Sequence, residues 1–62
     1  MKNKIREFRA RTKMTQDELA DKAKVSRQTI NAIENDKYDP SLPLAFSLAK
    51  AFKVRIEELF VP

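Results

Sequence analysis

Apolar residues recur along this chain at helical spacing from one end to the other. Ile5, Phe8 and Thr12 share a face at intervals of three and four residues, which predicts a first helix over about 2–12. No segment alternates between apolar and polar residues in the way that a half-buried strand does. The pattern therefore predicts an all-α fold with no strand.

Capping signals divide the rest of the chain into further helices. Thr15 and Glu18 match a capping box, in which each side chain bonds the backbone N–H of the other residue, and they predict a helix that runs to about Ala23. Ser26 and Ser41 are the N-cap candidates of the next two helices. The residues of these three helices that are expected to face the core are Leu19, Ala20, Ala23, Ile30, Ile33, Leu42, Ala45, Phe46, Ala49 and Phe52.

Only residues 24–26 separate the second helix from the third, and so short a turn forces the two helices to cross sharply. Ala20 and Ala23 are small enough to let the two helices approach closely. On spacing alone, any short helical hairpin remains an alternative.

The last segment combines a short fifth helix with more apolar residues than such a helix buries. Glu57 and Glu58 stand in its expected first turn, where the helix dipole favours acidic side chains. The residues expected to face inward are Val54, Ile56 and Leu59. The residues expected to form a homodimer interface, in which a second copy covers exposed apolar surface, are Ile56, Phe60, Val61 and Pro62.

The third helix, expected over about 27–35, has an outward face that is rich in amides. On a helical wheel at about 100° per residue, Ile30 and Ile33 point inward. The residues on or beside the opposite face are Arg27, Gln28, Asn31, Ala32 and Asn35. Amides pair with adenine, and Arg with guanine, at base edges in the major groove of DNA. This face therefore fits base reading, and an ordinary solvated helix face is the alternative.

Two charged residues fall where the pattern expects apolar contacts. Arg9 lies on the apolar stripe of the first helix, and Glu34 lies on the inner edge of the third helix near Ile30. Because the two charges are opposite, we expect an ion pair that bridges the two helices. Its role is structural and not catalytic.

Composition excludes several classes of protein. The 62 residues include no Cys and no His, which removes disulfides, thiolate metal sites and the usual general base. Gly is also absent, which excludes glycine-rich phosphate loops. No apolar run approaches a membrane span, and residues 1–13 are too charged for a secretory signal. We therefore expect one intracellular, soluble domain over 1–62 that is not an enzyme and needs no metal, cofactor, membrane or small-molecule ligand.

Together, these residues resemble the Cro/CI-type helix-turn-helix family, also called the XRE family, which has the lambda-repressor-like fold. The family pattern TQ-x-ELA appears over 15–20, and VS-x-x-x-I-x-x-x-E appears over 25–34. The stretch NDKYDPSL resembles the family's NGKYNPSL loop, and VRIEELF resembles its final short helix. The resemblance covers about 5–60, with the helix-turn-helix at about 15–35.

The resemblance implies a compact five-helix bundle that binds double-stranded DNA as a homodimer, with the third helix in the major groove of a palindromic operator. It implies a repressor in the cytoplasm of a prokaryote, encoded by the cell or by a phage, and associated with the nucleoid. The expected base contacts are Arg27, Gln28, Asn31 and Ala32. The expected contacts to the DNA backbone are Gln16, Thr29, Asn35, Lys37 and Tyr38. Gln16 is also expected to brace the first recognition residue.

A protein-binding module, such as a small antitoxin or an adaptor that kept the fold, is the main alternative function. Acidic or bulky apolar residues on the outward face of the third helix would favour it. That face instead carries amides, with Arg27 beside them, which favours DNA.

The resemblance also shows a departure at four helix ends. The family often has glycine at the positions that Lys13, Lys24, Asp36 and Lys53 occupy here. Such positions commonly take the left-handed backbone conformation, which costs a residue other than glycine roughly 1 kcal/mol. We therefore expect either left-handed residues at these helix ends or loops that differ locally.

Overall fold

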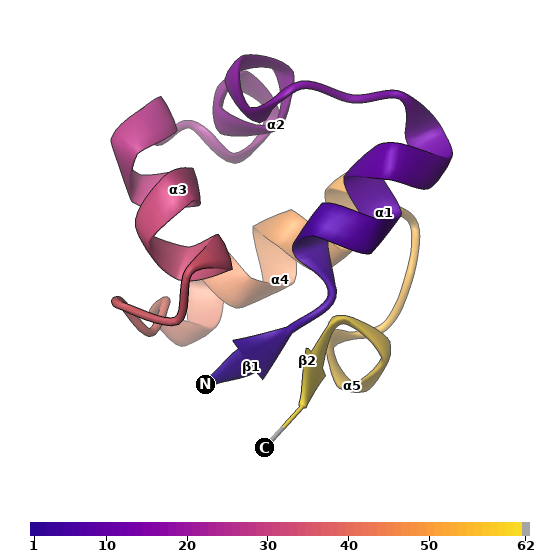
Figure 1. Cartoon of the computed structure of the whole chain (residues 1–62). Coiled ribbons are helices and arrows are strands. Elements are labelled where there is room, and N and C mark those ends of the chain that lie inside the picture. Colours follow the sequence, from indigo (N-terminus) through magenta and orange to yellow (C-terminus); the bar gives the residue numbers. More distant parts are fainter. Residues whose placement is uncertain (62) are drawn as a thin grey trace.

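The computed structural model describes residues 1–61, and these residues form five helices around one apolar core (Figure 1). The helices are α1 (Ile5–Thr12), α2 (Gln16–Ala23), α3 (Arg27–Glu34), α4 (Leu42–Ala51) and α5 (Ile56–Leu59). The prediction of an all-α fold with five helices is confirmed. None of the helices among residues 1–61 is long and apolar enough to cross a membrane.

The prediction that the chain has no strand is wrong at two short segments. β1 (Lys2–Asn3) pairs with β2 (Phe60–Val61) in antiparallel fashion, with Asn3 opposite Phe60. Two residues are too few to show an alternating pattern, so no local signal predicts either strand. Because Lys2 and Asn3 are extended, the first helix begins at Ile5 and not at Lys2.

Asn3 connects this pair of strands to one end of α1 and one end of α3. Its Oδ1 accepts a hydrogen bond from the Ile5 N–H at 3.2 Å, and its Nδ2 donates to the Ile33 carbonyl at 2.8 Å. Helix ends leave backbone groups without partners inside the helix. One side chain thus satisfies a group at the start of α1 and another at the end of α3.

The predicted caps are present and set where α2, α3 and α4 begin. The Thr15 hydroxyl accepts from the Glu18 N–H at 3.0 Å, and Glu18 Oε1 accepts from the Thr15 N–H at 2.8 Å. The bond from the Thr15 N–H, followed by the one with the Thr15 side chain, lowers the pKa of Glu18 below its ordinary value. Ser26 and Ser41 accept N–H bonds in the same way at the starts of α3 and α4.

Two residues of α4 that were expected in the core lie at the surface. Leu42 is 64% exposed and Phe46 is 58% exposed, while Leu48 is fully buried. α4 carries apolar residues on more than one face, so helical spacing alone does not tell which face meets the core. The largest fully buried side chains are Ile5, Leu19, Ile30, Ile33, Leu48 and Leu59.

The four helix ends without glycine adopt the left-handed conformation. Lys13, Lys24, Asp36 and Lys53 have φ angles of 56°, 59°, 59° and 58°. The expectation of left-handed residues is therefore confirmed, and these four helix ends adopt that conformation without glycine. Each of these residues has a Cβ in a region that sterically favours glycine.

Replacing Lys24 with glycine is expected to raise the free energy of unfolding by about 0.5–1 kcal/mol, because glycine has no Cβ to oppose the left-handed conformation. Thermal and denaturant unfolding measure the change. Lys22→Gly is the matched control, since glycine inside α2 should lower stability by a similar amount. A Lys24→Gly variant that unfolds as easily as Lys22→Gly would contradict this account.

Candidate nucleic-acid interface

α3 turns its polar side chains away from the core, as the helical wheel predicts. Ile30 and Ile33 are buried, whereas Gln28 and Asn31 are exposed. Arg27 is also exposed, in the first turn that Ser26 caps. Ala32 is half-buried and Asn35 is exposed. The outward surface of α3 is thus composed of amides with one guanidinium at its leading end.

Gln16 at the start of α2 joins this surface. Together with Arg27, Gln28 and Asn31 it lines a shallow groove of about 320 Å³. Arg27 Nε lies 3.9 Å from Asp17 Oδ1, and both side chains are largely exposed. Exposed ion pairs of this kind contribute little stability. Arg27 is therefore free to leave Asp17 for a better acceptor.

Glu34 is the centre of a polar network that holds α3 against α1 and α2. Its side chain is only 1% exposed. Arg9 donates from Nε to Oε2 at 2.6 Å and from Nη2 to Oε1 at 3.1 Å. The predicted ion pair between Arg9 and Glu34 is therefore confirmed. Gln16 Nε2 adds a third hydrogen bond, to Oε1, at 3.0 Å.

The contact of Gln16 differs from the expected one. Its amino group binds Glu34 and does not brace Arg27 or Gln28. The buried carboxylate attracts this donor because a buried charge needs every hydrogen bond within reach. Gln16 still borders the outward face of α3 through the groove that it shares with Arg27, Gln28 and Asn31.

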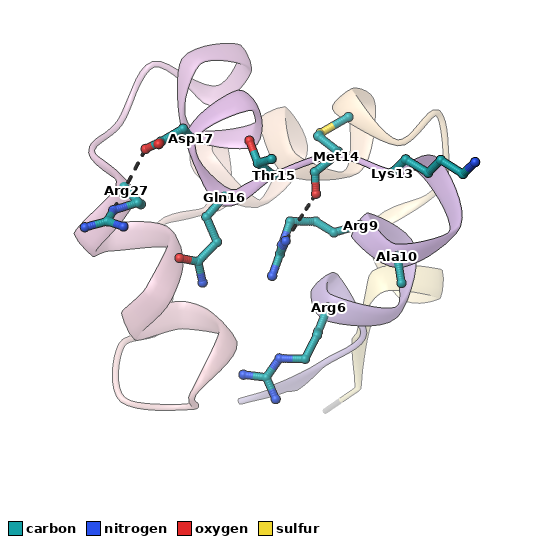
Figure 2. Close-up of a pocket in the computed structure, with 9 residues that line it drawn as sticks. All are labelled: Arg6, Arg9, Ala10, Lys13, Met14, Thr15, Gln16, Asp17 and Arg27. Atoms are coloured by element: carbon teal, nitrogen blue, oxygen red, sulfur yellow. Dashed lines mark hydrogen bonds and ion pairs between the residues drawn. The ribbon is translucent and has the colours of Figure 1, made fainter.

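A larger open cleft of about 580 Å³ lies next to this groove (Figure 2). The residues that line it are Arg6, Arg9, Ala10, Lys13, Met14, Thr15, Gln16, Asp17 and Arg27. Four of them are basic and one is acidic. Figure 2 shows Arg6, Arg9 and Gln16 reaching into the space between α1 and α3, while Lys13 points away from it. The charge of this cleft suits an anionic polymer that lies across the starts of α2 and α3.

The other residues that are expected to contact the DNA backbone differ in their hydrogen bonds and in their exposure. The Thr29 hydroxyl lies 3.0 Å from Ser26 Oγ, within hydrogen-bonding distance. Asn35 bonds other side chains, and Lys37 and Tyr38 are exposed in the turn that follows α3. The assignment of these residues to DNA contacts stays a prediction.

Arg6 belongs to the same polar network, and the sequence did not predict this role. Its Nε lies 3.8 Å from Glu34 Oε1, and its Nη2 donates to Asn35 Oδ1 at 3.2 Å. The sequence feature that could have predicted this role is the spacing of three residues between Arg6 and Arg9. That spacing places both guanidinium groups on one side of α1.

Comparison with known proteins agrees with this geometry. The model of the helix-turn-helix family matches residues 5–59. The chain is 59% identical over 61 residues to a protein of Methanocaldococcus jannaschii that is named as an uncharacterized HTH-type transcriptional regulator, and the match covers 98% of this chain and 92% of that protein. It is 36% identical over 56 residues to the immunity repressor protein of Bacillus phage phi105, which covers 90% of this chain and 39% of the repressor.

Solved structures show the same fold. The crystal structure of the restriction-modification controller protein C.AhdI from Aeromonas hydrophila superposes with a TM-score of 0.84 at 28% identity, over 90% of this chain and 85% of that one. The clp gene regulator ClgR from Corynebacterium glutamicum gives a TM-score of 0.82 at 28% identity, over 87% of this chain and 57% of that one. The chain belongs to the Cro/CI-type helix-turn-helix family. The family is one of DNA-binding transcriptional regulators.

Proposed function

We propose that this protein is a sequence-specific repressor that binds palindromic operator DNA as a homodimer, with α3 in the major groove. The observation that carries the proposal is the exposed face of Arg27, Gln28 and Asn31 on α3. The major groove admits an α-helix, and its base edges pair with amides and guanidinium groups. Ala32 keeps one side of this face slim enough to approach the bases.

The basic cleft beside α3 supports the same orientation. Contacts to phosphate fix the position of a protein on the duplex without reading its sequence. Arg6 and Arg27 border the cleft on either side of Gln16 (Figure 2), so a DNA strand that follows the cleft would run past the start of α3. Repression, as opposed to activation, is supported by the similarity to a phage immunity repressor.

Selection of bound sites from a random duplex library, at one stated salt concentration, tests the proposal. The expected result is a palindromic motif whose half-sites are centred about 10 base pairs apart, one turn of DNA. The motif placed across a promoter should then lower transcription of a reporter gene when the protein is present. A library without an enriched motif would exclude sequence-specific binding, and a rise in transcription would exclude repression.

One residue of the predicted homodimer surface is not available to a second copy. Phe60 was expected to be exposed, but it is only 4% exposed because β2 turns it into the core of its own chain. Pro62 lies outside the described residues. Val61 is exposed and Ile56 is half-buried, so these two residues remain accessible.

We assign the interface to the groove between α4 and α5, called here the α4–α5 groove. It measures about 660 Å³ and is lined by Phe46, Ala49, Lys50, Lys53, Val54, Arg55, Ile56 and Glu57. Leu42, one turn before Phe46, extends its apolar surface. In a two-fold dimer both copies bury the same side chains. Each Leu or Phe that becomes buried stabilises the dimer by about 1.5–3 kcal/mol. The groove shares no residue with the outward face of α3, so both copies keep that face free for DNA.

The Phe46→Glu variant is expected to sediment as a monomer near 7.2 kDa at micromolar concentration, while the natural protein sediments as a dimer. Phe46 is exposed in the single chain, so the variant should stay folded by circular dichroism. Val61→Glu is the matched control, because it adds the same charge at the surface that the sequence predicted, and it should leave the dimer intact. A dimeric Phe46→Glu variant, or a monomeric natural protein, would contradict this assignment.

A further inference from the structure

We propose that Asn35 fixes the direction of the Asn31 side-chain amide and thereby determines which bases α3 accepts at one operator position. The observation behind it is a relay of hydrogen bonds from Arg6 through Asn35 to Asn31. The inference rests on the proposed function, since it concerns how the outward face of α3 reads DNA.

The relay has a measured geometry. Arg6 Nη2 donates to Asn35 Oδ1 at 3.2 Å. Asn35 Nδ2 donates to the Asn31 backbone carbonyl at 2.9 Å and to Asn31 Oδ1 at 3.2 Å. Asn31 and Asn35 are four residues apart, so their side chains lie next to each other on one face of the helix.

The two ends of the relay determine its direction. The oxygen and nitrogen of a side-chain amide have nearly the same shape, so only their partners distinguish them. A guanidinium group can only donate, and a backbone carbonyl can only accept. The oxygen of Asn35 must therefore face Arg6, and its amino group must face Asn31. The Asn31 atom that meets this amino group must in turn be an acceptor, which is Oδ1.

Arg6 reaches from the surface, where its side chain is 65% exposed, toward the polar network inside the protein. Its Nε lies 3.8 Å from Oε1 of Glu34, the buried carboxylate that also binds Arg9 and Gln16. Figure 2 shows Arg6 reaching from α1 toward the space beside α3. The relay thus runs from a buried charge to an exposed side chain that is a candidate for base contact.

The consequence is that Asn31 offers DNA a donor. Its oxygen is turned toward Asn35, and its amino group makes no hydrogen bond within residues 1–61. In the major groove, guanine presents N7 and O6 as acceptors and thymine presents O4. Cytosine presents only a donor, and adenine presents a donor beside its acceptor. Asn31 should therefore favour guanine or thymine, and not adenine through the two-bond pairing that amides make when both ends are free.

The position that Asn31 reads is found by selection from a random duplex library with the natural protein and with Asn31→Ala. The preference that disappears in Asn31→Ala identifies the base pair. At that position the natural protein should favour guanine or thymine over cytosine by about fivefold, the discrimination expected from one net hydrogen bond.

Two substitutions of Asn35 then test the relay. In Asn35→Asp the carboxylate still accepts from Arg6 but can no longer donate. The Asn31 amino group should turn toward it and leave Oδ1 facing the DNA, which switches the preference to cytosine or adenine by about fivefold. In Asn35→Ala the guide is lost without an added charge. Asn31 can then present both ends of its amide, so the preference should move from guanine or thymine to adenine. The preferences at the positions read by Arg27 and Gln28 should stay unchanged in both variants.

Several results would contradict the relay from Arg6 to Asn31. A preference for guanine or thymine that persists in both Asn35 variants overturns the relay. A preference of the natural protein for adenine or cytosine also overturns it. Both results leave the proposed function standing. An Asn31→Ala variant that weakens binding to all sequences equally assigns Asn31 to phosphate and also overturns the relay. A natural protein that enriches no motif overturns the relay and the proposed function together. Asn35→Ala keeps the test decisive if the charge of Asn35→Asp abolishes binding.

Discussion

Replacing Glu34 with alanine is expected to lower the free energy of unfolding by about 3–5 kcal/mol, the largest effect of any single substitution considered. The variant leaves Arg9, which is only 19% exposed, and the amide of Gln16 without their shared acceptor. Domains of this size have about 5–15 kcal/mol of stability in total. Thermal unfolding followed by circular dichroism should show a midpoint that is lower by more than about 12 °C.

Asp21→Ala is the matched control for Glu34→Ala. It removes a carboxylate from the exposed surface of α2, and such changes alter stability by about 0.5 kcal/mol or less. Removing the other partner of the ion pair, in Arg9→Ala, should lower the free energy of unfolding as much as Glu34→Ala does, because it leaves a buried carboxylate without its cation. Equal midpoints for Glu34→Ala and Asp21→Ala would show that the network does not hold α3 in place.

Replacing Gln28 or Arg27 with alanine is expected to weaken binding to the selected operator by about 1–3 kcal/mol each, while binding to a random duplex changes far less. Both side chains are exposed at the start of α3, and neither contributes to the core. Fluorescence anisotropy with labelled duplexes at one salt concentration measures the two affinities. The ratio between them reports specificity independently of general attraction to DNA.

Lys37→Ala provides the contrast for these two variants. A side chain that contacts only phosphate should weaken binding to the operator and to the random duplex by the same factor. If Gln28→Ala shows the same equal loss, the side chain contacts the DNA backbone, and the reading of bases by the start of α3 is wrong.

Features that depend on neighbouring residues could be predicted from the sequence. The capping box of Thr15 and Glu18 acts over three residues, so its pattern is visible in the chain. The ion pair of Arg9 and Glu34 was predictable for another reason. Each charge interrupts an apolar stripe, and a buried charge requires a partner of opposite sign.

Features that depend on which of several faces is buried could not be predicted. Leu42 and Phe46 have the same helical spacing as core residues, and only the packing of α4 against its neighbours shows that they are outside. Phe60 is buried because β2 pairs with β1, which places Phe60 opposite Asn3, a residue near the other end of the sequence. No local sequence pattern predicts that two two-residue strands this far apart in the sequence will pair.

The partners of amide side chains were equally hidden. An amide both donates and accepts, so several groups within reach satisfy it. The sequence placed Gln16 and Asn35 near the DNA-facing side, but it did not indicate that Gln16 binds Glu34 or that Asn35 links Arg6 to Asn31. These contacts depend on how α1 packs beside α3.

The most direct test of base reading by α3 is an NMR structure of the isotope-labelled protein bound to its selected duplex. Base reading by α3 predicts intermolecular NOEs from the side chains of Arg27, Gln28 and Asn31 to base protons in the major groove. It also predicts that the α4–α5 groove makes no NOEs to DNA. NOEs to DNA that come from the α4–α5 groove, with none from α3 to a base, would contradict the proposed function.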